Sequence, residues 1–504
     1  MQMFQDCSRS TRLLLLGTLL FAVARLLFVH FGTLDLSPDE AQYWDWSRQL
    51  DWSYYSKGPL VAWLLWLTTH LAGSTEVGVR LMAISLQAIL VITSYTLVCR
   101  LSPDEKTGRR AGWLAFWVLQ LTPLFGAGGL LVAPDAPATV CWALSLLVLS
   151  QIEWDSAQPQ WRRFLLLGLL LGLGGLGKYT VAMFYPLGLL YLSIDATRRQ
   201  WLWRPQPYVA GLVSGLCVLP ILYWNSQHDW ASFQHVLGQA GGGRAFQPLL
   251  TLGDFLAGQA GALGGLLFIP LVVYIYRGPR AQQGRLLWWF GVPVLALFLL
   301  KALTAKVQPN WPVLGVYGTT MGMTIWLAQA ARGWRLTAIA GLVMAAALTV
   351  PLHDTFLLRH MGVQYPVKHD PLKVMWGWAE LGKALGLERA ELGDLPVLTT
   401  RYQTASELAF YTPGQPHVLY VNPGYRRRNQ YDYWPWPKSL PTDMFYVRES
   451  HDDVTIDPVV AAAFNSCVLR RQITVFRDGL HLRQANIFIC RGFKGIDRLM
   501  ADHF

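Results

Sequence analysis

The chain has 504 residues, of which 53% are hydrophobic and only 14% are charged. In a soluble domain about a quarter of all residues are charged, so this composition indicates a membrane protein. The net charge of +11 does not indicate nucleic-acid binding, because most lysines and arginines lie in short loops between long apolar blocks. We therefore expect membrane lipids as partners and no nucleic acid.

Apolar blocks long enough to span a membrane follow one another up to residue 352. They run over 11–31, 77–99, 111–132, 136–152, 208–224, 253–276, 286–303, 312–331 and 336–352. The first block is too long for the apolar region of a typical signal peptide, and no small-residue cleavage site follows it. We therefore expect it to remain as the first span.

A further apolar stretch, residues 164–193, is interrupted by glycines and by Lys178 and has basic loops at both ends. Both ends are therefore expected on the same side of the membrane. This requires two short helices hinged at Gly177 and Lys178, and the chain then crosses the membrane about eleven times.

The distribution of basic residues predicts the orientation of the chain. Most of them lie in one set of loops, which holds Arg9, Arg12, Lys106, Arg109, Arg110, Arg162, Arg163, Arg198, Arg199, Arg204, Arg277, Arg280, Arg285, Arg332 and Arg335. The alternate set holds fewer, namely Arg48, Lys57, Lys178, Arg244 and Lys306. The positive-inside rule then places the N-terminus in the cytoplasm. The outward loops are 32–76, 133–136, 225–252 and 303–311.

Residues 1–352 are thus predicted to form a transmembrane domain, and the polar, proline-rich residues 353–504 a second, outward-facing domain. The second domain has strand-like segments at 396–400, 418–421, 444–447, 467–476 and 480–490, and helical ones at 372–385 and 404–411. The predicted fold class is a mainly α polytopic membrane protein with a small C-terminal α/β domain. Cys467 and Cys490 flank the Asp478-Gly479 turn, and a disulfide and two separate buried thiols both remain open.

The first outward loop carries adjacent acids, Asp39 and Glu40, directly after the first span. Acids beside anionic headgroups are unfavourable, so a general base or a metal ligand is one interpretation. The other is that Ser37 caps a helix, with Pro38 and the two acids in its first turn. Helix capping alone does not explain why other loops on the same face carry comparable groups.

Asp135 lies between two prolines in the second outward loop, where a helix cap is the commoner role. The cations Lys57, Lys178, Arg244 and Lys306 lie on the face that the positive-inside rule leaves poor in them. Some can reach out to lipid phosphate. Together, acids and cations on one face suit a phosphorylated lipid whose sugar is transferred, because cations stabilise a leaving phosphate.

The first loop resembles that of the bacterial family 39/83 glycosyltransferases, in the residues Asp39-Glu40-Ala-Gln-Tyr43-Trp-Asp-Trp-Ser and Tyr54-Tyr55-Ser-Lys57-Gly-Pro59. These are polytopic GT-C-fold enzymes that use polyprenyl-phosphate sugars. The family includes the aminoarabinose transferase of lipid A, rhizobial galacturonic acid transferases and distant protein mannosyltransferases. Weaker similarities follow in the family's order at 133–137, 172–179, 224–233, 306–312 and 401–411.

The resemblance implies an enzyme that moves a sugar from an undecaprenyl-phosphate-type donor to lipid A, another glycan or protein on the periplasmic face of the inner membrane. It implies inversion at the sugar, with Asp39 as the catalytic base and Glu40 beside it. The implied binding residues are Tyr43, Tyr54, Tyr55, Lys57, Asp135, Lys178, Arg244, Lys306 and Asn310. No cofactor is firmly predicted, and a divalent metal ion between Asp39 and Asp135 remains open.

Two departures leave the transferred sugar open. Gln42 replaces a basic residue of the aminoarabinose enzymes, and Lys57-Gly58-Pro59 replaces their Lys-Pro-Pro pattern. The alternative function is a transporter or flippase of lipid-linked sugars, which broken helices would favour, although the charges gather in loops rather than in mid-span. A third is a non-catalytic scaffold whose tail binds a partner.

Overall fold

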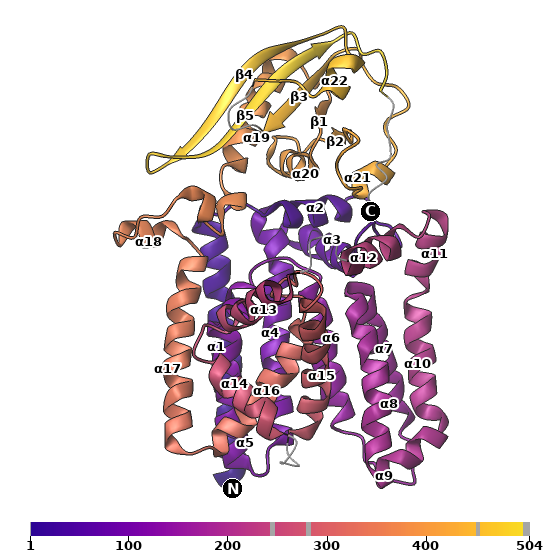
Figure 1. Ribbon diagram of the computed structural model, residues 1–504, viewed down its shortest axis with the longest axis vertical. Helices are drawn as coiled ribbons and strands as arrows, with labels where there is room; N and C mark the ends of the chain where they lie inside the picture. Colours follow the sequence, from indigo (N-terminus) through magenta and orange to yellow (C-terminus); the bar gives the residue numbers. More distant parts are fainter. Residues whose placement is uncertain (1, 242–246, 279–283, 450–453, 497–504) are drawn as a thin grey trace.

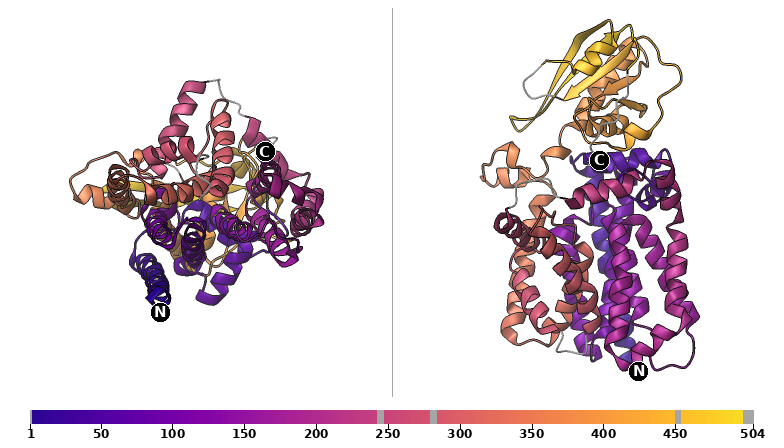
Figure 2. Two further views of the ribbon diagram at one scale, coloured as in Figure 1. Left: turned by 90° about the horizontal axis from the view of Figure 1, so that it is seen from below. Right: turned by 45° about the vertical axis from the view of Figure 1, so that its right-hand side comes forward.

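Figure 1 shows the computed structural model of the chain, which describes residues 2–241, 247–278, 284–449 and 454–496. A bundle of long helices carries a smaller part with a β-sheet at one end. In Figure 1 the N-terminus and the short helix α9 (Ala196–Arg199) lie at the opposite end of the bundle. The right-hand view of Figure 2 also places the N-terminus there. We call residues 2–360 the helical part and residues 361–496 the sheet part.

The helical part consists of helices joined mostly by short connections. Besides α9 they are α1 (Gln2–Phe31), α2 (Pro38–Ser47), α3 (Leu60–Ala72), α4 (Glu76–Leu101), α5 (Glu105–Leu121), α6 (Asp135–Leu149), α7 (Trp161–Gly177), α8 (Phe184–Ile194), α10 (Pro205–Cys217), α11 (Leu219–Gln227), α12 (Ala231–Gly241), α13 (Pro248–Ala262), α14 (Phe268–Arg277), α15 (Arg285–Ala302), α16 (Val313–Gln329), α17 (Arg332–Thr349) and α18 (Phe356–His360). Among the described residues, four helices are long and apolar enough to span a membrane, or up to six if two bent pairs each count as one span. The chain is thus a multi-pass protein by length and composition, and the count of about eleven crossings stays a prediction.

The break predicted at Gly177 and Lys178 is present. Helix α7 ends at Gly177, Lys178 is extended, and the 3-10 turn η2 (Tyr179–Met183) leads into α8. Glycines let α7 pack closely on α10, because a Cβ at Gly172 would lie 2.5 Å from the Cβ of Cys217.

Two other predicted blocks are divided, which the apolar pattern did not show. The block 208–224 bends by 41° between α10 and α11, where Pro220 opens the second helix. The block 253–276 is divided between α13 and α14, where Gly264 and Gly265 adopt positive φ.

The sheet part contains all five predicted strands, in the order β2-β1-β3-β5-β4. They are β1 (Val397–Thr399), β2 (Val418–Tyr420), β3 (Met444–Glu449), β4 (Ser466–Arg477) and β5 (Leu480–Arg491). β1 is parallel to β2 and β3, and the pairs β3–β5 and β4–β5 are antiparallel. The predicted helix 404–411 is α20 (Tyr402–Tyr411), whereas the one predicted from 372 begins only at Trp378, as α19 (Trp378–Leu392), after Gly377 at positive φ.

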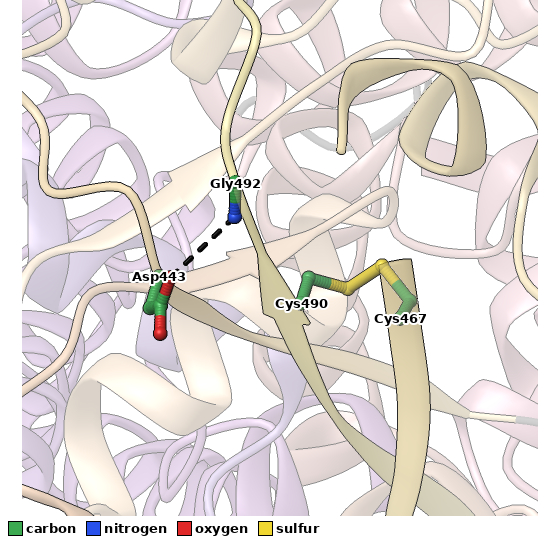
Figure 3. The surroundings of a disulfide bond; sticks show 4 residues. All are labelled: Asp443, Cys467, Cys490 and Gly492. Atoms are coloured by element: carbon green, nitrogen blue, oxygen red, sulfur yellow. Dashed lines mark hydrogen bonds between the residues drawn. A yellow bond between two sulfur atoms is a disulfide. The ribbon is translucent and has the colours of Figure 1, made fainter. Parts of the chain in front are cut away.

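Cys467 and Cys490 face each other in the register of β4 and β5 and form a disulfide (Figure 3). Asp478 and Gly479 both adopt positive φ in the hairpin turn, as a two-residue turn of this kind requires. The disulfide alternative left open by the sequence is therefore the one that the structure contains.

Helix α2 is held between the two parts. It packs against α20, and its aromatic side chains share one hydrophobic core with the sheet part. The hydroxyl of Tyr431 donates to Asp45 Oδ2 (2.8 Å), and the backbone N–H of Trp378 donates to Asp35 Oδ2 (2.7 Å). The sheet part is thus fixed to the end of the bundle that carries Asp39.

Candidate active site

Asp39 lies in the first turn of α2, and the helix start has the geometry expected from the sequence. Ser37 Oγ accepts from the backbone N–H of Glu40 (3.3 Å), and the backbone N–H of Ser37 donates to Glu40 Oε2 (2.9 Å). This reciprocal capping fixes the helix start, with Pro38 in its first turn. The capping interpretation is therefore correct for Ser37 and Glu40, while Asp39 takes no part in the cap.

The Asp39 side chain lies instead at a polar cavity of about 340 Å³ between α2, the start of α6 and the sheet part. We call it the polar cavity. The cavity is lined by Ser37, Asp39, Gln42, Tyr43, Tyr55, Ser56, Lys57, Leu131, Val132, Ala133, Pro134, Asp135, His235, Gln308, Asn310, Trp311, Tyr402, Arg427, Arg428, Asn429 and Gln430. Segments far apart in the sequence thus meet around one carboxylate.

Asp39 is reached by solvent within this cavity but surrounded by protein. Burial raises the pKa of its carboxyl group, and the charges of Lys57 and then Arg427 oppose this rise. The hydroxyl of Tyr402 donates to Asp39 Oδ1 at 3.5 Å, which also favours the ionised form. A carboxylate with a raised pKa and a defined donor is suited to accept a proton.

Asp135, in the wall of the polar cavity, forms an ion pair with Lys178. Lys178 Nζ donates to Asp135 Oδ1 at 2.5 Å, and Asn310 Nδ2 donates to Asp135 Oδ2 at 3.3 Å. Helix α6 has no side-chain cap, so the cap interpretation of Asp135 is wrong. Its carboxylate joins the break after α7 to the segment that precedes α16.

A second, mostly apolar cavity of about 650 Å³ adjoins the first, and we call it the apolar cavity. Its lining includes Leu297, Phe298 and Leu300 from α15. The two cavities share wall residues: Ser56, Lys57, Pro134, Asp135, Asn310 and Trp311. Lys178 and Lys301 line the apolar cavity. The site therefore offers an apolar chamber, a cationic boundary and a polar chamber with an acid.

Lys57 lies at this boundary. Burial lowers the pKa of its ammonium group, as does the charge of Lys178, whereas Asp135 and Asp39 act in the opposite direction. An anion placed between Lys57 and Lys178 would relieve their mutual repulsion and favour the charged form of Lys57. The boundary is therefore suited to bind a phosphate.

The chain resembles glycosyltransferases in sequence. A family model described as dolichyl-phosphate-mannose-protein mannosyltransferase matches residues 56–224. The lipid A galacturonosyltransferase RgtD of Rhizobium johnstonii is 29% identical over 371 residues, which cover 70% of this chain and 75% of that protein.

The fold comparison extends over nearly the whole chain. ArnT from Cupriavidus metallidurans, in its crystal structure bound to undecaprenyl phosphate, matches with a TM-score of 0.62 at 16% identity. The match covers 94% of this chain and 98% of ArnT, and the apo structure of ArnT gives a TM-score of 0.61. This chain is a glycosyltransferase with the fold of ArnT. The transporter alternative is not favoured, since the matching family model and RgtD are both named as transferases.

Most of the predicted site residues of the glycosyltransferase meet at the two cavities. Those that line one or both are Asp39, Tyr43, Tyr55, Lys57, Asp135, Lys178 and Asn310. Lys306 is exposed and lines neither cavity, because it lies before the turn that places Asn310. Arg244 lies outside the described residues. The roles of all these residues stay predictions.

Glu40 and Tyr54 were expected at the site, but the structure places them elsewhere. Glu40 is fully buried and binds Arg80, which donates to both its carboxylate oxygens at 3.3 Å. Glu40 Oε1 also accepts from the backbone N–H of Val132 (3.1 Å). Tyr54 stacks on Trp46, and its hydroxyl donates to backbone carbonyls of the same loop. Both side chains hold the loop in shape, because Tyr54 bonds within the loop and Glu40 ties it to Arg80 of α4 and to Val132.

A metal ion between Asp39 and Asp135 does not fit the donor set. Both oxygens of Asp135 accept from nitrogen donors, one of them an ammonium group. Within residues 2–241, 247–278, 284–449 and 454–496, no group of three or more His, Cys, Asp or Glu side chains could hold a metal.

Several residues of the polar cavity were not predicted, and five of them come from the sheet part: Tyr402, Arg427, Arg428, Asn429 and Gln430. Tyr402 lies in a segment that resembles the family, but its side chain could not be assigned a place from sequence. Arg427 belongs to a run of three arginines, and such a run by itself indicates a segment exposed to solvent. His235 stacks near Tyr55, and burial together with the charges of Arg427 and Lys57 lowers its pKa to about 3, so it is neutral at physiological pH.

Proposed function

We propose that this glycosyltransferase moves a sugar from an undecaprenyl-phosphate-type donor to lipid A or another cell-envelope acceptor. The observation that carries the proposal is the junction of an apolar and a polar cavity at Lys57 and Asp135. RgtD is named for transfer to lipid A, and the matching ArnT structure contains undecaprenyl phosphate. Both names agree with the chemistry that the two cavities favour.

The donor would lie across the junction. Its prenyl chain would occupy the apolar cavity, whose wall includes aliphatic and aromatic side chains of α15. Its phosphate would lie between Lys57 and Lys178, where ammonium groups form charge-assisted hydrogen bonds. The sugar would then project into the polar cavity, toward Asp39.

The transfer step needs a base on the side of the sugar opposite to the phosphate. An acceptor hydroxyl oxygen bonds to the anomeric carbon while the bond from that carbon to the phosphate oxygen breaks. Asp39 takes the hydroxyl proton, and the electron pair of the broken bond stays on the phosphate beside Lys57 and Lys178. This geometry inverts the anomeric carbon. If the acceptor atom is an ionised phosphate oxygen, Asp39 positions it instead.

We further propose the membrane arrangement. The N-terminus lies in the cytoplasm of a bacterial cell, about eleven crossings form domain 1–352, and domain 353–504 lies in the periplasm. The Cys467–Cys490 disulfide supports this side, because the periplasm is oxidising. The site would then lie at the periplasmic leaflet of the inner membrane, where an acceptor in the periplasm can enter it.

The test uses the full-length protein in detergent, with undecaprenyl-phosphate-linked sugars as donors and lipid A as the acceptor. Mass spectrometry of the product gives the added sugar, and NMR of the new linkage gives its anomeric configuration. Asp39→Asn is expected to lower the turnover rate by at least about 10³-fold. Asp254→Asn, which alters an exposed acid outside both cavities, serves as the matched control.

Near-normal transfer by the Asp39→Asn variant would contradict the assigned base. Retention of the anomeric configuration would contradict direct displacement. A deletion strain provides an independent check, since a sugar mass lost from its envelope lipids identifies donor and acceptor together.

A further inference from the structure

Arg427 reaches the polar cavity from the segment between β2 and α21 (Gln430–Tyr433) of the sheet part. Its side chain is exposed to the cavity, and its charge is close enough to act on both Asp39 and Tyr402. Gln430 anchors the same segment, because its Oε1 accepts from the backbone N–H of Tyr55 (2.7 Å). The segment is therefore held against the catalytic loop.

The arginines beside Arg427 have other contacts. The guanidinium of Arg426 lies over the ring of Tyr425 at 5.3 Å, outside the cavity. Arg428 Nη1 donates to the hydroxyl of Tyr433 at 3.5 Å. In the described chain, Arg427 has no carboxylate within 4.0 Å, whereas Arg401, Arg470 and Arg483 of the sheet part each form an ion pair.

Arg427 contacts Tyr402 and its charge acts on Asp39, but neither acid in the wall of the polar cavity forms an ion pair with it among the described residues. Of the two acids in its wall, Asp135 is paired with Lys178, and Asp39 accepts from Tyr402. Because Arg427 is exposed at the cavity and forms no ion pair with the described residues there, its guanidinium is free to bind a ligand anion. Its planar fork matches a carboxylate or a phosphate in two-point hydrogen bonding.

We propose that Arg427 binds an oxyanion of the substrate inside the polar cavity, either a carboxylate on the transferred sugar or a phosphate on the acceptor. This inference rests on the proposed function. The donor's own phosphate is not the expected ligand, because Lys57 and Lys178 hold it at the apolar junction. Arg427 then selects substrates, and the sheet part supplies selectivity to a reaction whose base and phosphate site belong to the helical part.

The experiment compares four substrate combinations on the purified full-length protein. The donors are undecaprenyl phosphate carrying a hexuronic acid or the matching neutral hexose, and the acceptors are phosphorylated or dephosphorylated lipid A. The value of kcat/KM is measured for the unchanged protein, Arg427→Gln, Arg427→Lys and the matched control Arg426→Gln.

The unchanged protein is expected to prefer the partner that bears the oxyanion by about 10²-fold. Arg427→Gln should abolish this preference by slowing only the anionic partner, and Arg427→Lys should restore part of it. The Arg426→Gln control should keep the preference. A preference that follows the donor identifies the sugar carboxylate, and one that follows the acceptor identifies the phosphate.

An equal loss for all four combinations in Arg427→Gln would overturn the inference, as would an unchanged preference in that variant. Failure of the unchanged protein to transfer from either donor would instead count against the proposed function. Thermal unfolding of each variant separates a loss of fold from a loss of binding.

Discussion

Lys178 Nζ lies 2.5 Å from Asp135 Oδ1, although 43 residues separate them in the chain. This pair ties the end of α7 to the start of α6, and Lys178 Nζ also approaches the backbone carbonyls of Asn310 and Trp311 at 3.4 Å. Three segments of the helical part thus meet at one ammonium group. The boundary between the two cavities depends on that meeting point.

We expect this pair to contribute to stability as a unit. Both side chains are largely buried, with 16% of Lys178 and 20% of Asp135 exposed, so removing one partner leaves the other charge uncompensated. Asp135→Asn and Lys178→Met should each lower the free energy of unfolding, and the double variant should lose about 1–2 kcal/mol less than the sum. Denaturant unfolding in detergent measures this, and strictly additive losses would contradict the pair.

Amide substitution should change the free energy of unfolding in opposite directions at the neighbouring residues Glu40 and Asp39. It should lower this free energy at Glu40 and raise it, at neutral pH, at Asp39. Glu40→Gln leaves the fully buried Arg80 with only the more distant carboxylate of Glu76, at 4.0 Å, and should lower the free energy of unfolding by about 3 kcal/mol. The control is Glu105→Gln, which alters an exposed pair with Arg109 and should cost less than about 0.5 kcal/mol. Equal stability of the two variants in denaturant unfolding would show that Glu40 does not hold the loop.

The pH dependence of transfer should report on Asp39. A base acts in its ionised form, and burial raises the pKa of Asp39. Activity should therefore fall on acidification at a pH higher than the ordinary pKa of an aspartate. Tyr402→Phe removes a hydrogen bond to the ionised form and should move this acidic limb to higher pH. The pH profile of kcat/KM measures the limb, and an unmoved limb in Tyr402→Phe would contradict the contact.

The same raised pKa predicts the effect of Asp39 on stability. A carboxyl group whose folded pKa lies above its unfolded one favours the folded state at low pH, and this contribution is lost as the pH rises through the folded pKa. Asp39→Asn should therefore stabilise the protein at neutral pH, and its advantage should vanish at a pH below the unfolded pKa. Unfolding at both pH values tests the sign.

Gly58 follows Lys57 at the position where the aminoarabinose enzymes have a proline. A Cβ there would clash with the carbonyl oxygen of Leu176 and lie 2.8 Å from its carbonyl carbon. Gly58→Ala should therefore displace Lys57 or the end of α7 and reduce transfer more than tenfold. Gly253→Ala, where a Cβ meets nothing within 4 Å, is the control, and similar activities in the two variants would contradict this packing.

The sequence predicts those features whose determinants are local. Ser37 and Pro38 mark the start of α2, and short runs rich in β-branched, aromatic and other apolar residues mark the five strands, because capping and strand propensity act over a few residues. The partner of Glu40 could not be predicted in this way, since Arg80 lies 40 residues away in the next long helix. Two adjacent acids look alike in sequence, and only their distant neighbours distinguish them.

The same reason explains why the wall contributed by the sheet part was missed. Tyr402 and Arg427 belong to segments with ordinary surface composition, and nothing in that composition relates them to an acid in the first loop. Their place follows from how α20 packs on α2, which is a property of the tertiary fold. Family resemblance identified the segment at 401–411 without assigning it a function.

The contact between Tyr402 and Asp39 spans 363 residues, and this has a consequence for biosynthesis. Asp39 emerges among the first residues made, whereas the side chain that donates to it is made only after about four-fifths of the chain. A nascent chain therefore carries Asp39 and Lys57 without the last wall of the polar cavity. Synthesis itself delays completion of this cavity until the sheet part has folded onto α2.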